Sequence, residues 1–296
     1  MRANVYFTRE ITPEKVVELY RALGVELPGK VAVKVHSGEK GNQNFLRPEF
    51  WCPMVEEVHG TIVECNTAYG DAAGGVRDHT ESHRKLLQEH GWTKYFDVDL
   101  MDAEGPDVVW PIPNGKVLKE NHVGKHILHY DSMLVLAHFK GHTMGGYGGA
   151  LKQLAIGCAS RAGKALIHSA GKTDDRFKTW EQHASSVVFP EAMADAASSV
   201  IEHFRGKIAF INVMKNLSVD CDCCAVAEDP CMNDVGILSS LDPVALDRAC
   251  IDLVINSNDP GRDHFMERVN SRHGTHTIDS AETLGIGTQA YELVKV

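Results

Sequence analysis

Short apolar runs alternate with stretches of helical periodicity along most of the chain. The run at 31–35 and the uninterrupted apolar run at 132–137 have the length and composition of strands buried on both faces. Between such runs, apolar residues recur at helical spacing, as in 12–23, where Thr12 and Pro13 supply a favoured N-cap and first helical residue. This alternation predicts an α/β fold with a mainly parallel sheet covered by helices.

The same pattern places the remaining elements and suggests how they are grouped. We expect further strands at 61–65 and 207–213, and helices that start at Pro48, cover 77–90 and 190–203, and run from Asp242 to Val254. A length of 296 residues suits one large α/β domain or two lobes with a cleft between them. The polar stretch at Arg205–Gly206 predicts a main lobe, 1–206, and a smaller C-terminal lobe, 207–296; one domain over 1–296 is the alternative.

Composition and charge exclude several classes of protein. With 43% hydrophobic and 24% charged residues the chain is globular and neither disordered nor collagen-like. A net charge of −10 offers no basic surface for nucleic acid or an anionic membrane, so neither is an expected partner. Residues 1–10 lack the apolar stretch of a signal peptide, and no run approaches the roughly 18 apolar residues of a membrane span. We therefore expect a cytoplasmic protein.

The richest candidate chemistry follows the apolar run 132–137. Open α/β sheets bind ligands where strands end, and the glycines of this segment allow a ligand to approach the backbone closely. The amides of the following helix N-terminus favour an anion, whereas an ammonium at Lys152 in its first turn is disfavoured by the helix dipole. Lys152 is therefore expected to meet a compensating anion or to act as a nucleophile or covalent anchor, with His142 as its catalytic partner. The alternative is a flexible turn with a solvated lysine. The candidate ligand-binding residues here and just downstream are Lys140, Gly145, Gly146, Gly148, Gly149 and Arg161.

Four cysteines lie within eleven positions, Cys221, Cys223, Cys224 and Cys231. Because the cytosol keeps thiols reduced, they are more readily metal ligands than disulfides, and soft sulfur suits iron–sulfur clusters, zinc and nickel. Their spacing matches neither a ferredoxin motif nor a paired zinc ribbon. A loop of ordinary reduced thiols is the alternative.

Histidines give further candidates. His168 ends an apolar run and, in company with His142 and Lys152, is a candidate metal ligand. His79 and His83 share a helix face and could bind a metal, although neighbouring charges favour a solvated face. His36 follows the 31–35 strand and belongs either to the same site or to a plain loop. We place His122, His126 and His129 at the surface, and Asp242 as an N-cap.

Segments across nearly the whole chain resemble the uncharacterised iron–sulfur-center proteins, a family defined by a domain of unknown function. The matching segments are 33–42, 138–142 with 145–152, 221–223 and 234–247. The resemblance implies an iron–sulfur cluster. Many members carry a ferredoxin module inserted after the position of His168; this chain lacks it, so only the Cys221–Cys231 group could hold a cluster here.

A more distant resemblance is to nickel-dependent lactate racemase. The intervals from His142 to Lys152 and from Lys152 to His168, with the glycines between the first pair, are similar. In that family the lysine tethers a pyridinium pincer nucleotide, the later histidine ligates its nickel, and the earlier histidine is an acid/base. The resemblance implies these roles for Lys152, His168 and His142. A second catalytic histidine does not align, leaving His79 and His83 as candidates, and the nucleotide-phosphate motif is not recognisable in 66–77, where Arg77 could serve.

Together these observations predict a metal- or metallocofactor-dependent enzyme with racemase-like or redox chemistry on a small organic acid. Its site would contain His142, Lys152 and His168 at the carboxyl edge of the sheet. The alternative is a non-catalytic iron–sulfur or metal-binding protein that uses the Cys221–Cys231 group and meets a redox partner protein. A third possibility is a metal-free scaffold that binds another anion.

Overall fold

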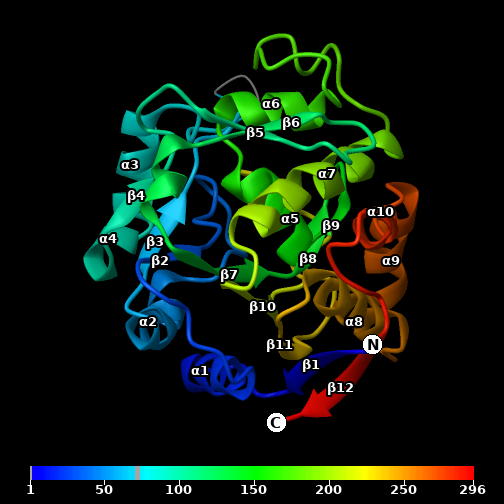
Figure 1. Cartoon of the computed structure of the whole chain (residues 1–296). Coiled ribbons are helices and arrows are strands. Elements are labelled where there is room, and N and C mark those ends of the chain that lie inside the picture. Colours follow the sequence, from blue (N-terminus) through cyan, green and yellow to red (C-terminus); the bar gives the residue numbers. More distant parts are fainter. Residues whose placement is uncertain (1, 71–73) are drawn as a thin grey trace.

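Strand β7 (Ser132–His138) lies near the middle of an eight-stranded sheet in the computed structural model, which describes residues 2–70 and 74–296 (Figure 1). The strand order is β12-β1-β11-β10-β7-β2-β3-β4. The other strands of this sheet are β1 (Ala3–Thr8), β2 (Val31–Lys34), β3 (Thr61–Glu64), β4 (Val98–Leu100), β10 (Ile208–Met214), β11 (Gly236–Ser240) and β12 (Tyr291–Lys295).

Five neighbouring strands run in the same direction. Strand β7 pairs in parallel with β2 on one side and β10 on the other, and β3 and β4 continue the parallel part. Strand β11 is antiparallel to both β10 and β1. The predicted mainly parallel sheet is confirmed, and the carboxyl ends of β2, β3, β7 and β10 lie at one edge. Two hairpins complete the strands: β5 (Val108–Pro111) with β6 (Glu120–Val123), and β8 (Lys140–His142) with β9 (Gly146–Gly148).

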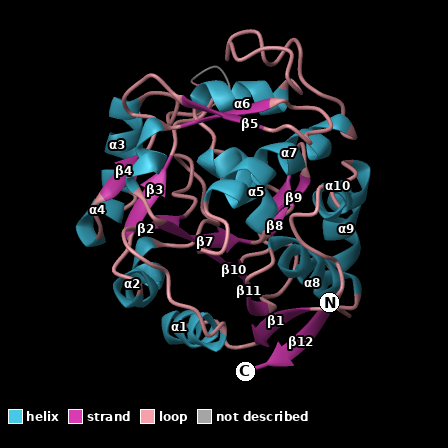
Figure 2. Ribbon diagram, viewed as in Figure 1, coloured by secondary structure: helices cyan, strands magenta, loops and turns pink. Residues whose placement is uncertain are grey.

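Helices cover both faces of the sheet (Figure 2). One face packs against α1 and α2 through residues such as Val16 and Trp51, and the other against α5, α7 and α8 through residues such as Leu154 and Phe189. Both faces are thus withdrawn from water, as the apolar strands require. The helices are α1 (Pro13–Ala22), α2 (Pro48–Glu57), α3 (Thr80–Glu89), α4 (Trp92–Tyr95), α5 (Ala150–Cys158), α6 (Arg161–His168), α7 (Val188–His203), α8 (Pro243–Ile255), α9 (Arg262–Ser271) and α10 (His276–Thr283), with a 3-10 turn, η2 (Lys125–His129).

Local capping explains why several helices begin where the sequence predicts. Thr12 accepts a hydrogen bond from the Lys15 amide at the start of α1, and Asp242 accepts from Val244 and Ala245 at the start of α8. The helix expected over 77–90 begins later, at Thr80, because Arg77 is drawn into buried ion pairs.

Strands from both sides of residue 206 pair directly, as Ile208 does with Met133. The division into lobes stays a prediction.

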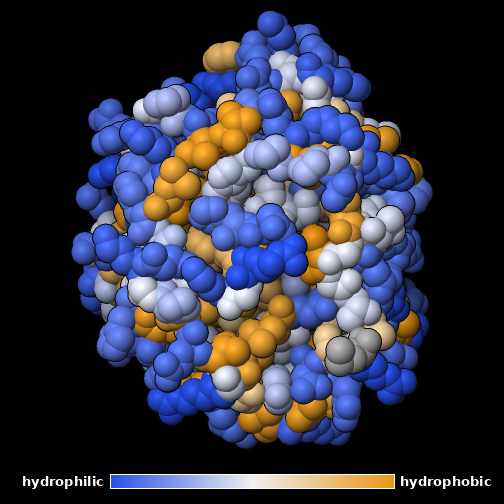
Figure 3. Space-filling model, viewed as in Figure 1, coloured by the Kyte–Doolittle hydropathy of each residue, from blue (hydrophilic) through white to orange (hydrophobic). Residues whose placement is uncertain are grey.

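Among the described helices, none combines the length and apolar character needed to cross a bilayer. The face shown in Figure 3 is mostly hydrophilic, with smaller hydrophobic patches between polar side chains.

Candidate functional site

A buried cavity of about 50 Å³ lies beyond the carboxyl ends of β2 and β3. Helices α5 and α6, on the same side of the sheet in Figure 1, form one wall, and the loop after β10 contributes Cys223. This is the edge at which open α/β sheets bind ligands. The lining residues are Lys34, His36, Glu64, Cys65, Thr67, Ala68, Tyr69, Arg77, His142, Lys152, Gln153, Ile156, Gly157, Lys164, His168, Trp180 and Cys223.

The Cys-Asp-Cys sequence holds its sulfurs in place through the central carboxylate. Asp222 is buried and lies 3.0 Å from Nδ1 of His138 and 2.9 Å from Nζ of Lys140, at the ends of β7 and β8. Burial opposes ionisation, but His138 and Lys140 hold the pKa of Asp222 well below its usual range. Lys140, predicted as a ligand-binding residue, is thus placed in an internal ion pair.

Two donors lie against the sulfur of Cys221. Nζ of Lys152 lies 3.3 Å from Sγ, and the backbone amide of Cys223 lies 3.4 Å away. The buried His36 ring lies close enough to this thiol to affect its pKa. Burial would lower the pKa of Lys152, but the Cys221 and Cys223 sulfurs outweigh it and raise that pKa. Burial and the Cys223 sulfur raise the pKa of Cys221 against the opposing effect of Lys152 and His36. A metal cation would supply further positive charge beside this sulfur.

The four cysteines predicted as metal ligands lie in two different places. Ligand atoms of His142, Cys221 and Cys223 all lie within 4.8 Å of one another. The Cys224 side chain lies close enough to Cys223 to raise the pKa of Cys223. Cys231 is placed differently, because its Sγ donates to the Leu217 carbonyl at 3.3 Å.

Two of the three histidines that line the cavity, His142 and His168, present different nitrogens to it. Nδ1 of His142 accepts the Gly145 amide at 2.8 Å, so the neutral ring carries its proton on Nε2 and is a proton donor there. Nδ1 of His168 faces the Lys164 carbonyl at 3.0 Å and must donate, which leaves Nε2 unprotonated. Burial, then Lys152, lowers the pKa of both rings, that of His168 to about 3.

A buried ion-pair network at the strand ends was not predicted. Lys34, at the end of β2, lies 2.6 Å from a Glu64 oxygen at the end of β3. Arg77 pairs with Glu39 at 3.1 Å and with Glu64 at 3.8 Å. Burial would lower the pKa of Arg77, but Tyr69 and these two glutamates outweigh it and raise that pKa. The one available signal was a charged residue inside or directly after an apolar strand, as at Lys34 and Glu64.

The anion at the N-terminus of α5 comes from the chain itself. The Asp247 carboxylate accepts the amides of Ala150 at 2.8 Å and Leu151 at 3.0 Å, the Tyr147 hydroxyl at 3.0 Å and the Asn212 amide at 2.8 Å. The expectation that these amides are free for a ligand is therefore wrong. Burial, partly offset by these donors, raises the pKa of Asp247 to about 6.

Other predicted residues lie outside the cavity lining. Arg161 donates to the Asp78 carbonyl at 2.8 Å. His79 is exposed, but His83 is fully buried and faces the Asn66 side chain at 3.2 Å, so the expected solvated helix face is wrong for His83. His36 contributes to the site rather than to a plain loop. Within the described residues, the cavity lining does not include Gly145, Gly146, Gly148 or Gly149, which belong to the β8–β9 hairpin or its junction with α5.

The residues fit a metal ion but not the phosphates of a nucleotide cofactor. The sulfurs of Cys221 and Cys223 supply soft ligands. The donors that would hold a phosphate are already used: Asp247 occupies the α5 amides, and Glu39 and Glu64 occupy Arg77. Residues 71–73 of the 66–77 region lie outside the described residues.

Residues 31–252 match the model of a family described as a domain of unknown function, DUF362. Among solved structures, the chain is similar to the lactate racemase apoprotein from Thermoanaerobacterium thermosaccharolyticum, with 12% identity, a TM-score of 0.41, and coverage of 72% of this chain and 51% of that one. It is also similar to a protein from Thermotoga maritima, with 10% identity, a TM-score of 0.43, and coverage of 93% and 59%. The chain thus spans between half and three fifths of the length of these two proteins. No curated protein matches the chain.

Proposed function

The chain belongs to the DUF362 family, and we propose that it is a metal-dependent enzyme that acts on a small organic acid in the buried cavity. One observation carries the proposal: the sulfurs of Cys221 and Cys223 lie within 4.8 Å of each other and of a ring nitrogen of the proton donor His142, with the Lys152 ammonium against Cys221. The cysteine sulfurs are soft metal ligands, and the buried Lys152 ammonium attracts an anion. The site can therefore hold a metal and an organic acid side by side.

Each polar group of this site has a proposed role. Cys221 and Cys223 hold the metal as thiolates, and Lys152 attracts the acid anion to its side. When bound, the metal supplies Lewis-acid polarisation of a ligand oxygen or redox capacity. His142 donates a proton from Nε2, and His168 offers an unprotonated Nε2 that accepts a proton.

A second candidate function is a non-catalytic metal- or cluster-binding protein that exchanges electrons with a redox partner. The contact of the Cys223 side chain with both Cys221 and Cys224 favours it, because three neighbouring sulfurs could hold an iron–sulfur centre. In this case His142 and His168 would be dispensable.

Metal content tests the thiolate site directly. Protein purified without oxygen and without a histidine tag should contain about one nickel, iron or zinc per chain, and cobalt-loaded protein should show sulfur-to-metal charge-transfer absorption. Cys221→Ser combined with Cys223→Ser should abolish both signals. Cys231→Ser is the matched control and should retain them. Full metal loading of the double variant, or metal-free wild type that takes up none of these ions, would overturn the proposal.

Proton exchange separates the enzyme from the electron carrier. We expect the metal-loaded protein to exchange the α-proton of a small hydroxy or keto acid with deuterated water, as followed by NMR. His142→Gln should stop the exchange while metal content stays unchanged. Absence of exchange with every acid tested, together with a reversible redox signal, would favour the second candidate.

A further inference from the structure

Two buried lysines on the cavity wall have no carboxylate partner. Lys152 on α5 contacts the Cys221 sulfur, and Lys164 on α6 donates to the Ala159 carbonyl at 2.6 Å. Within the described residues, no carboxylate lies within 4.0 Å of either ammonium, whereas Lys34 and Lys140 each have one. Both side chains are at least nine-tenths buried, at 8% and 6% exposure. A buried ammonium without a counter-ion is costly, which indicates that a ligand supplies the missing negative charge.

An unpartnered amide lies on the same wall. Gln153 follows Lys152 on α5, lines the cavity and is 7% exposed. Its Nε2 has no hydrogen-bond partner within the described residues. Buried polar groups are nearly always hydrogen-bonded, so an orphaned donor at a cavity is an independent sign of a ligand that accepts hydrogen bonds.

The two ammonium groups that lack an ion pair indicate a ligand with two negatively charged groups. Lys34 and Arg77 are offset by Glu64 and Glu39, and Lys140 by Asp222. The cysteine centre is neutral with a divalent metal on two thiolates, and also with two protonated thiols in the metal-free protein. The ammonium groups of Lys152 and Lys164 then remain without an ion pair, although the buried Asp102 carboxylate also acts on Lys164.

The volume of the cavity and the kind of donors that line it restrict the class of ligand further. A cavity of about 50 Å³ has room for roughly three to five water molecules, since one water needs about 10–15 Å³. The groups that usually hold phosphate, helix amides and an arginine fork, are already paired, which leaves two separate point charges and an amide.

We propose that Lys152, Gln153 and Lys164 form the binding site of a compact dicarboxylate. The inference rests on the proposed function in taking this cavity as the active site, and it specifies the class of organic acid. Lys164 and Gln153 bind the carboxylate farther from the sulfurs, and Lys152 binds the one beside Cys221.

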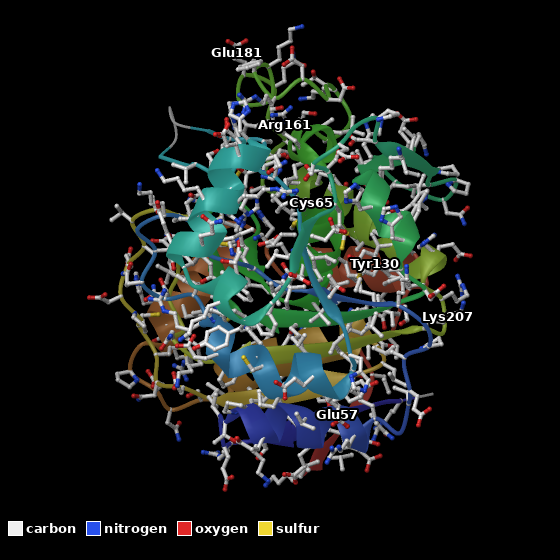
Figure 4. All side chains as sticks on the ribbon, turned by 90° about the vertical axis from the view of Figure 1, so that its left-hand side faces the viewer. Glu57, Cys65, Tyr130, Arg161, Glu181 and Lys207 are labelled. Carbon is white, nitrogen blue, oxygen red and sulfur yellow. The ribbon has the colours of Figure 1, made fainter. Side chains whose placement is uncertain are left out.

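Calorimetric titration of metal-free, reduced protein tests the site without any contribution from the metal. The probes are oxalate, malonate, formate and inorganic phosphate at constant ionic strength. We expect one equivalent of oxalate or malonate to bind at least about tenfold more tightly than formate or phosphate. Lys164→Met should weaken dicarboxylate binding at least about tenfold and Gln153→Leu severalfold. Lys207→Met, at an exposed position at the edge of the molecule in Figure 4, should not change it.

A second measurement uses only the wild-type protein, so it remains informative even if Lys164→Met does not fold. In wild-type protein, oxalate should slow acetylation of Lys164, read by peptide mass spectrometry, and leave Lys207 unaffected. Tighter binding of phosphate, equal binding of formate, or absence of both binding and protection would each overturn the proposal. Metal loading is measured separately, so loss of dicarboxylate binding with intact thiolate–metal absorption refutes this inference alone.

Discussion

Nζ of Lys152 lies 3.3 Å from Sγ of Cys221, which joins the helix after the glycine-rich hairpin to the cysteine loop 69 residues later in the chain. The contact makes the lysine and the thiol one electrostatic unit. Each group stabilises the charged form of the other in a site from which water is largely withdrawn.

Replacing Lys152 tests this unit. Lys152→Met keeps most of the side-chain volume but removes the ammonium, so the pKa of Cys221 should rise further. Alkylation of Cys221 by iodoacetamide near neutral pH should slow about tenfold or more, since one pKa unit changes the thiolate fraction about tenfold. Peptide mass spectrometry measures the rate, with Lys207→Met as the matched control. An unchanged rate would show that Lys152 does not act on this thiol.

His83 should make the fold sensitive to acid. Burial, then the charge of Arg77, lowers its pKa from 6.5 to about 3, so the unfolded chain binds an additional proton below pH 6.5. Stability due to this group is complete above pH 6.5 and falls by about 1.4 kcal/mol per pH unit down to about pH 3.

A non-titrating variant isolates that contribution. In His83→Gln the pH dependence of the unfolding free energy should decrease by about this slope, as measured by urea denaturation between pH 4 and 7. His183→Gln, at an exposed position, should behave like wild type. Identical slopes for all three proteins would contradict the assignment.

Asp247 should affect stability with the opposite sign. Its pKa is raised from 3.8 to about 6 in the folded protein, so its contribution is largest in acid and is lost as pH rises through about 6. The difference of about two pKa units corresponds to about 3 kcal/mol. Between pH 4 and 7 the unfolding free energy of wild type should fall by about this amount relative to Asp247→Asn. Parallel curves would show that Asp247 ionises normally.

Gly141 should be intolerant of a side chain. A Cβ at this position would lie 2.2 Å from the Val219 carbonyl oxygen, where β8 approaches the loop that leads to Cys221. Gly141→Ala should cost about 1–3 kcal/mol of stability and lower cobalt affinity, because the cysteine loop must move. Gly105→Ala, whose Cβ meets no atom within 4 Å, is the control. Equal melting temperatures and cobalt affinities would exclude this close approach.

The sequence pattern predicted the fold better than the site. The helices and strands depend on neighbouring residues in the sequence, whereas the site depends on contacts between residues far apart in it. The run at β7, the Thr12 cap of α1 and the Asp242 cap of α8 are local signals, and the structure confirms them. The edge of the sheet that carries the candidate chemistry also followed from strand direction.

Partners distant in sequence could not be predicted. Asp247 reaches the amide of Ala150 across 97 residues, and Arg77 reaches Glu39 across 38. Charge pattern made His83 look solvated because Glu81 and Arg84 flank it, yet its ring turns inward to Asn66. Such pairings depend on which strands become neighbours, and no local periodicity encodes that.

The bond from the Asn42 side chain to the Cys221 carbonyl has a consequence for folding order. It spans 179 residues, and Asn42 also holds the Cys224 carbonyl at 2.9 Å. The cysteine loop takes its shape only after β2, β7 and β10 have found one another, and contacts of such high sequence separation form late because closing long loops is entropically costly. A nascent or partly folded chain would therefore lack the assembled thiol site. Uptake of metal would then indicate that the whole domain has folded.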